Sequence, residues 1–183
     1  MKGVFMIQIG ASSATIDTPV EHLMACHRRI EQRLDTLARA AEHLESNRAA
    51  ALEGIARSLE FLNSSGALHT EDEENSFFPR LRAKLSPDQI GFLDSLEQQH
   101  GEAESILARL KLLVDRAVGE NPVPPALVEE YRDCAEQLRS LYRAHIQSED
   151  EILTAMARQS LSEPELTQIS GEMRQRRKTA GKL

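Results

Sequence analysis

Apolar residues recur every three or four positions along most of this chain, which is the period of an amphipathic helix. The nine glycines and seven prolines gather at a few boundaries between these stretches. The pattern predicts an all-α protein. Four long helices are expected over about 18–45, 46–79, 86–119 and 126–157, with a short accessory helix starting at Ser162.

The expected helix boundaries carry their own chemistry. Residues 18–21 (Thr-Pro-Val-Glu) and 86–89 (Ser-Pro-Asp-Gln) place a hydroxyl side chain three positions before Glu or Gln, with proline at the first helical position. Residues 119–125 contain three prolines, which push the residues before them out of the α region. Long helices with such short connections bury their apolar stripes best as an antiparallel up-down four-helix bundle.

One domain accounts for the whole length, because 183 residues are enough to bury a core. We expect an N-terminal tail over 1–17, the bundle over 18–160, and a short helix with a basic, solvated tail over 161–183. The apolar run at 4–9 is shorter than a signal-peptide core, and no later segment approaches 18 consecutive apolar residues. These features favour a cytoplasmic protein without a membrane span.

Composition excludes several classes of protein. The chain is 28% charged and 40% hydrophobic with a net charge of −7, which is typical of a soluble protein and disfavours a general nucleic-acid binder. Its two cysteines, Cys26 and Cys134, form no Cys-x-x-Cys pair. A disulfide scaffold and a cysteine-based zinc site are therefore excluded, and both thiols should be free.

The histidines are the informative residues. Four of the six have a glutamate four positions later, and each of the four expected helices carries one such pair. Residues four apart lie on one face of a helix, so each pair presents an imidazole and a carboxylate in the same direction. Isolated pairs are usually surface contacts, but four pairs on four helices favour a metal site in the bundle core. The pairs are His27 with Glu31, His69 with Glu73, His100 with Glu104, and His145 with Glu149.

An internal repeat supports this interpretation. Residues 69–79 and 145–155 have polar and apolar positions in the same register, so the second and fourth helices match each other. The first and third helices match in the same way after His27 and His100. Such a bundle is pseudo-symmetric about a two-fold axis and would place its halves on opposite sides of a metal pair.

A single histidine at 27 followed by His-x-x-x-Glu at 69–73, 100–104 and 145–149 resembles the hemerythrin-like superfamily, the HHE cation-binding domains. The similarity covers about residues 19–160. It implies a four-helix bundle that binds two non-haem iron ions, bridged by carboxylates and by oxygen atoms derived from solvent.

The resemblance also implies roles for single residues. The terminal nitrogen ligands would be His27, His69, His100 and His145, and the bridging carboxylates would be Glu73 and Glu149. Glu104 would be a seventh ligand at the position where oxygen carriers supply a histidine. This more anionic set should favour the ferric state over reversible oxygen carriage.

Several assignments near these ligands have alternatives. Asp150 competes with Glu149 as the carboxylate ligand, with Glu149 preferred. Glu31 is expected behind the ligands or at the surface, and Cys26 in the apolar core. Tyr142 either packs in the core or donates a hydrogen bond to a bound ligand. Phe77 and Phe78 are expected in the core, and His22 and His43 in solvent.

Three functions fit this sequence. The first is binding or sensing of O₂, NO or iron by a di-iron domain, and the second is redox chemistry at the same centre, such as catalase-like disproportionation of peroxide or repair of nitrosylated iron. The third is a metal-independent helical interaction or regulatory module. The first two predict a small diatomic molecule or peroxide as partner, with iron preferred over manganese or zinc and oxidative stress as the setting.

Overall fold

All regular structure in the described part of the chain is helical. The computed structural model describes residues 16–182, and that range contains no strand. None of its helices is both long and apolar enough to cross a membrane. Nearly all of the expected N-terminal tail lies outside the described residues. The elements are α1 (Pro19–Ala40), η1 (Ala41–His43), α2 (Arg48–Phe61), η2 (Leu62–Gly66), α3 (Ala67–Asp72), η3 (Glu73–Phe77), α4 (Phe78–Arg82), α5 (Pro87–Gly119), α6 (Pro125–Ser148), η4 (Glu149–Leu153), α7 (Thr154–Ser160) and α8 (Glu163–Thr179).

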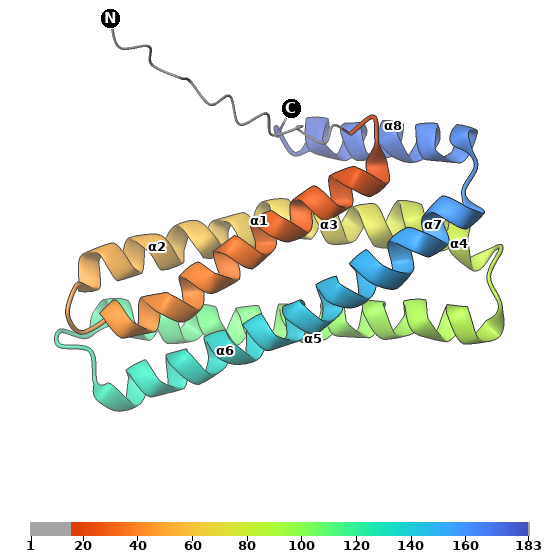
Figure 1. The fold of residues 1–183 in the computed structure, drawn as a ribbon. Helices are drawn as coiled ribbons and strands as arrows, with labels where there is room; N and C mark the ends of the chain where they lie inside the picture. Colours follow the sequence, from red (N-terminus) through yellow and green to blue (C-terminus); the bar gives the residue numbers. More distant parts are fainter. Residues whose placement is uncertain (1–15, 183) are drawn as a thin grey trace, which may run out of the picture.

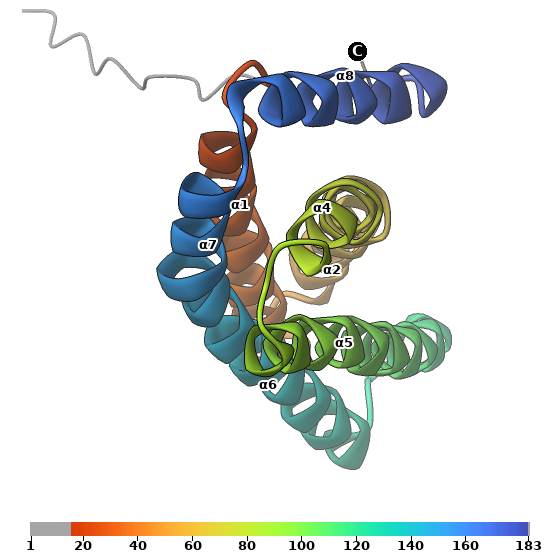
Figure 2. The same ribbon diagram turned by 90° about the vertical axis from the view of Figure 1, so that its right-hand side faces the viewer.

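These elements join into four long rods and one crossing helix (Figures 1 and 2). The rods are α1 with η1, α2 through α4, α5 alone, and α6 through α7. The first rod contacts the second and the fourth, and α5 contacts the same two. The expected helical bundle is therefore present, and its helices lie close to the expected ranges. The second rod continues to Arg82 instead of ending near residue 79.

The expected capping chemistry is present at one of two places, and a further capping box starts α8. Ser86 and Ser162 each form a capping box, with Gln89 and Glu165 respectively at the third helical position. Thr18 precedes Pro19 as expected, but its side chain does not cap α1. Between α5 and α6 the proline-rich segment is non-helical, because the residues before its prolines are pushed out of the α region.

The core consists of two apolar clusters with a polar layer between them. One cluster joins the inner faces of α2, the second half of α5 and much of α6, and the other joins α4, the first half of α5, α7 and α8. Along α1, Leu23 belongs to the second cluster and Ile30 to the first, with His27 between them. Along α5, His100 lies in the same way between Leu96 and Ala103. The histidines that the sequence singles out therefore lie at one level of the bundle.

Part of the basic C-terminal segment packs against the bundle, whereas residues 178–182 are exposed as expected of a solvated tail. The segment is helical to Thr179 as part of α8, which contacts α3, η3 and α1 (Figure 1). Asp72 of α3 is fully buried and accepts from Nε of Arg176 at 2.8 Å and from Nη2 of Arg177 at 2.7 Å. Burial of a carboxylate requires such partners, so these arginines are fixed in the interior.

One histidine is placed differently from the expectation. His22 of α1 is buried instead of facing solvent, and Nη2 of Arg177 lies 3.2 Å from its Nε2. The expectation was wrong because α8 covers this part of α1. His43 is exposed, as expected.

Candidate metal centre

Four imidazoles and two carboxylates meet in the polar layer of the bundle. Among the described residues they form two groups of four, and the ligand atoms of each group lie within 4.8 Å of one another. Every member is buried. One group is His27, His69, Glu73 and Glu149; the other is Glu73, His100, His145 and Glu149.

The two carboxylates belong to both groups. Oε1 of Glu73 lies 3.2 Å from Nε2 of His69, and Oε2 lies 3.4 Å from Nε2 of His100. Oε2 of Glu149 lies 3.1 Å from Nε2 of His27 and 3.2 Å from Nε2 of His145. Each carboxylate thus lies between one imidazole of each group, which is the arrangement that a bridging ligand requires.

The polar atoms of this layer are left unsatisfied by the protein. Both oxygens of Glu73, both oxygens of Glu149 and Nε2 of His27 are buried without a hydrogen-bond partner in the described chain. Nε2 of His100 faces Nε2 of His145 at 3.1 Å, so at most one proton fits between them. Buried charges of this kind are costly unless a counter-ion compensates them. Imidazole nitrogen and carboxylate oxygen together suit iron, manganese and zinc, so the residues fit a pair of metal cations.

A change in helix geometry accompanies each shared carboxylate. The π-helical segment η3 begins at Glu73 and the π-helical segment η4 begins at Glu149. Wider π turns inside α-helices occur frequently at functional sites, where they re-aim side chains. The repeat between the second and fourth rods therefore extends from the sequence to the backbone.

Hydrogen bonds hold three of the four imidazoles from behind. Nδ1 of His27 lies 2.7 Å from Oδ1 of Asp150, and Nδ1 of His100 lies 2.8 Å from Oε1 of Glu74. Nδ1 of His145 lies 2.8 Å from Oε1 of Gln99. Because these oxygens only accept, each Nδ1 carries the proton and Nε2 is directed to the centre. Nδ1 of His69 is buried without a partner in the described chain.

The pKa values follow from burial and these contacts. Burial lowers the pKa of His27, but the hydrogen bond with Asp150 and the close carboxylates of Glu149 and Glu73 outweigh it and raise the pKa to about 12. His100 behaves similarly, with a pKa raised to about 9, chiefly by Glu73. Burial lowers the pKa of His69 to about 4. Without metal, His27 and His100 are therefore protonated at neutral pH.

The two carboxylates respond to the same contacts in the opposite direction. Burial raises the pKa of Glu73, but its imidazole neighbours, His69 first, outweigh burial and hold it well below its usual range. Burial and the charge of Glu73 raise the pKa of Glu149, but the close imidazoles of His145 and His27 outweigh them and lower it. Both side chains are thus charged at neutral pH.

Six of the seven expected ligands come together, and Glu104 does not. Its side chain is exposed, and it lines a cavity beside His100 and Tyr142 instead of joining either group. Glu104 lies inside α5, which is α-helical throughout, whereas Glu73 and Glu149 each begin a π turn. The spacing of four residues alone does not bring a carboxylate into the centre. Glu104 therefore does not contribute to the more anionic ligand set that was expected.

The residues named as alternatives lie in different places. Asp150 supports His27 from behind, while Glu149 lies in the centre. Glu31 is exposed. Cys26 is buried and accepts from Nη2 of Arg29 at 3.1 Å, outside both groups. Cys26 and Cys134 are both free thiols, as expected.

The aromatic residues surround the second group. The ring of Phe78 stacks on His100 at 6.4 Å, and the ring of Tyr142 meets that of His145 edge-on at 6.1 Å. Phe77 and Phe78 are fully buried, which confirms their expected place in the core. Tyr142 is half-buried and donates no hydrogen bond to the described chain.

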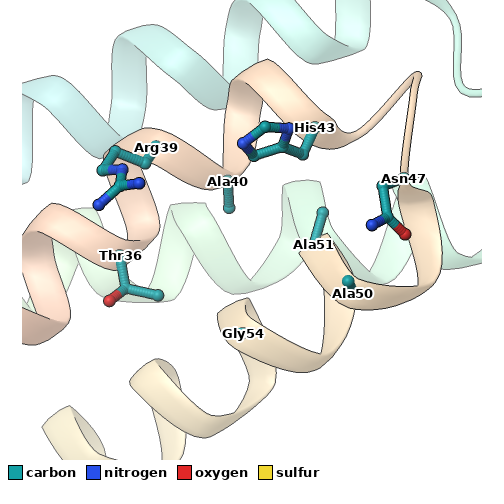
Figure 3. A pocket seen from close by; sticks show the side chains of 8 residues that line it. All are labelled: Thr36, Arg39, Ala40, His43, Asn47, Ala50, Ala51 and Gly54. Atoms are coloured by element: carbon teal, nitrogen blue, oxygen red, sulfur yellow. The ribbon is translucent and has the colours of Figure 1, made fainter.

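A second hollow lies away from the metal ligands. It occupies about 350 Å³ between α1 and α2, beside the exposed His43, and small side chains such as Ala50, Ala51 and Gly54 form one wall (Figure 3). Its lining includes no residue of the two groups. This hollow is therefore separate from the candidate metal centre.

Two supporting residues, Glu74 and Gln99, were not expected from the sequence. Glu74 directly follows Glu73, just as Asp150 directly follows Glu149, so the internal repeat contained this signal. Gln99 precedes His100 in α5, and nothing in the local pattern links it to His145.

The chain is similar to known proteins. The family model described as Hemerythrin HHE cation binding domain matches residues 18–157. An uncharacterized protein of Haemophilus influenzae is 30% identical over 168 residues, which cover 90% of this chain and 92% of that protein. The matched range contains all six residues of the two groups. The chain belongs to the hemerythrin HHE cation-binding family.

Proposed function

We propose that this protein binds two non-haem iron ions inside an antiparallel up-down bundle and handles O₂, peroxide, NO or iron under oxidative stress in the cytoplasm. The observation that carries the proposal is the pair of buried carboxylates, Glu73 and Glu149, shared by two groups of imidazoles and left without hydrogen bonds. A single ion would leave one of the two groups uncompensated.

The residues divide naturally between two ions. His27 and His69 would hold one, His100 and His145 would hold the other, and Glu73 and Glu149 would connect them. The mixed nitrogen and oxygen donors suit iron, with manganese and zinc as competitors. Bound iron would supply a redox couple and an electrophilic site for a small molecule.

Neighbouring residues would orient the imidazoles for metal binding. Asp150, Glu74 and Gln99 hold Nδ1 protonated, so that Nε2 offers its lone pair towards the centre. Phe78 covers one face of His100 and keeps water from that side. The ligands are thus oriented before any metal arrives, which lowers the ordering cost of binding.

Metal analysis tests the proposal. Protein reconstituted anaerobically with Fe(II) should hold about two irons per chain, since two donor groups are present. Glu73→Gln and Glu149→Gln keep the volume but remove the shared charge, and each should lose at least one iron. Glu31→Gln, with an exposed side chain, is the matched control. Equal iron content in all three variants, or none in the parent protein, would contradict the assignment.

The catalytic part of the proposal is slow disproportionation of two molecules of hydrogen peroxide into one of dioxygen and two of water. An oxygen electrode should record iron-dependent O₂ evolution that disappears in the metal-free protein. Iron-loaded protein that evolves no O₂ would restrict the function to binding or sensing.

A further inference from the structure

One cavity reaches the candidate metal centre from the surface. It has a volume of about 480 Å³ and lies between the second rod and α5, with Tyr142 of α6 contributing from a third element. His100 belongs to its lining. The cavity therefore leads to the group that contains His100 and His145.

Tyr142, whose phenol group can donate a hydrogen bond, lines this cavity. Tyr142 lies one turn before His145 in α6, and its ring is 6.1 Å from that of His145. A half-buried phenol beside a metal ligand is placed to donate to a molecule bound there.

The outer part of the cavity is acidic. Glu71 and Glu104 are exposed, and Glu74, which also supports His100, is 36% exposed in its side chain. Lys111 shares the lining, but its Nζ pairs with Asp115 at 2.6 Å. Three carboxylates against one paired ammonium group disfavour the entry of anions.

We propose that this cavity is the binding site and entry route for an uncharged molecule of a few atoms, of the class of NO, O₂ and hydrogen peroxide, and that Tyr142 donates a hydrogen bond to it. The molecule meets the His100 and His145 side of the centre. This inference rests on the proposed function, because it requires metal in the centre.

The entry route is tested with nitric oxide as the probe. Ala108 of α5 is exposed and lines the cavity, so Ala108→Trp fills the route without disturbing the core. In the reduced, iron-loaded protein it should slow NO binding by about tenfold, because close-packed walls do not yield readily to a new ring. Ala50→Trp makes the same change in the separate hollow between α1 and α2 and should leave the rate unchanged. Stopped-flow absorption measures both rates.

The hydrogen bond is tested with Tyr142→Phe, which retains the ring. The dissociation constant for NO should rise about two- to tenfold, the range expected for one hydrogen bond between neutral groups. Unchanged affinity would remove Tyr142 from the site. Iron content is measured first in every variant, since a role in packing alone would lower it and the proposed role would not.

The acidic outer part of the cavity should slow the entry of anions, and azide is the probe that tests this. Replacing both exposed carboxylates, Glu71→Gln with Glu104→Gln, should speed azide binding about two- to fivefold at low salt and leave NO binding unchanged. The difference should shrink at high ionic strength. If iron is retained but Ala108→Trp binds NO as fast as the parent protein, the cavity is not the route. If the parent protein retains no iron, the proposed function fails instead.

Discussion

The two halves of the bundle have the same ligand pattern and differ in what supports it. Each half supplies a His-x-x-x-Glu sequence that enters a π turn, at Glu73 in η3 and at Glu149 in η4. In each half the next residue is acidic and holds a histidine of a neighbouring rod, Glu74 with His100 and Asp150 with His27. The primary ligands and these first supports obey the pseudo-symmetry.

The contacts around the two π turns differ between the halves. α8 fixes η3, because Oγ of Ser76 donates to Oε2 of Glu172 at 2.5 Å and also lies 2.6 Å from Nη2 of Arg176. At the equivalent position in η4, Ile152 is 44% exposed. The π turn of η3 is therefore covered by α8, whereas the π turn of η4 exposes Ile152 to solvent. The geometry of the candidate ligands is thus repeated in both halves, whereas the contacts that support it differ.

The largest expected effect comes from breaking the α8 contact. Asp72 precedes Glu73 and is fully buried between Arg176 and Arg177. Asp72→Asn should lower the free energy of unfolding by about 3 kcal/mol, because it leaves two partly buried guanidinium groups without their charge partner. Urea denaturation measures the loss.

The pseudo-symmetric control for this variant is Ser148→Ala. Ser148 precedes Glu149 as Asp72 precedes Glu73, but its hydroxyl donates only to the carbonyl of Ala144 in its own helix. The change should stay within about 0.5 kcal/mol. Similar losses in both variants would show that the halves are supported alike.

Much of this arrangement could be predicted from the sequence because it depends on local patterns. Helical periodicity indicated the rods, and the capping box expected at Ser86 indicated the start of α5. Histidine and glutamate at a spacing of four indicated the metal ligands, since that spacing fixes the face of a helix. These signals need no knowledge of distant contacts.

The errors arose where the outcome depends on a partner far along the chain. Arg177 looks like part of a solvated tail until Asp72, 105 residues earlier, is placed beside it. The burial of His22 depends on the same helix. Glu104 shares the spacing of Glu73, and only the backbone shows that α5 contains no π turn there. Long-range packing decides where these residues lie, so helical periodicity could not predict their positions.

The second prediction concerns support for the imidazoles. Gln99 accepts from Nδ1 of His145, whereas the equivalent position before His27 holds Cys26, and Nδ1 of His69 has no partner in the described chain. Gln99→Leu should weaken metal binding about 10- to 100-fold, the usual cost of losing such a support. Equilibrium titration against a chelator measures the affinity.

Cysteine substitution is the matched control on the other half. Cys26→Ser combined with Cys134→Ser should retain the metal affinity of the parent protein, because neither sulfur belongs to the centre. Loss of metal in this variant, with helix content intact by circular dichroism, would mean that Cys26 takes part in holding His27 or His69.

The third prediction concerns protons, for which the halves should behave alike. The raised pKa values of His27 (about 12) and His100 (about 9) mean that both imidazoles are protonated at pH 7. Metal requires the neutral form, so each ion should displace about one proton, and affinity should rise as the pH increases from 6 to 8. Calorimetric titration with Zn²⁺ in two buffers of different ionisation enthalpy counts the protons released. Affinity that falls with rising pH over this range would reverse the assignment.

The smallest expected effect tests whether η4 is truly uncovered. Ile152→Ser should change the free energy of unfolding by no more than about 0.5 kcal/mol, because its side chain is 44% exposed and lies opposite no fifth helix. Ser76→Ala, at the equivalent position of η3, should cost about 1–3 kcal/mol, since it removes a buried hydroxyl that serves Glu172 and Arg176. Both are measured in the metal-free protein by urea denaturation. A loss above 1 kcal/mol for Ile152→Ser would indicate that this isoleucine is covered in solution, for example by a second copy of the chain, and a dependence of that loss on protein concentration would identify such a dimer.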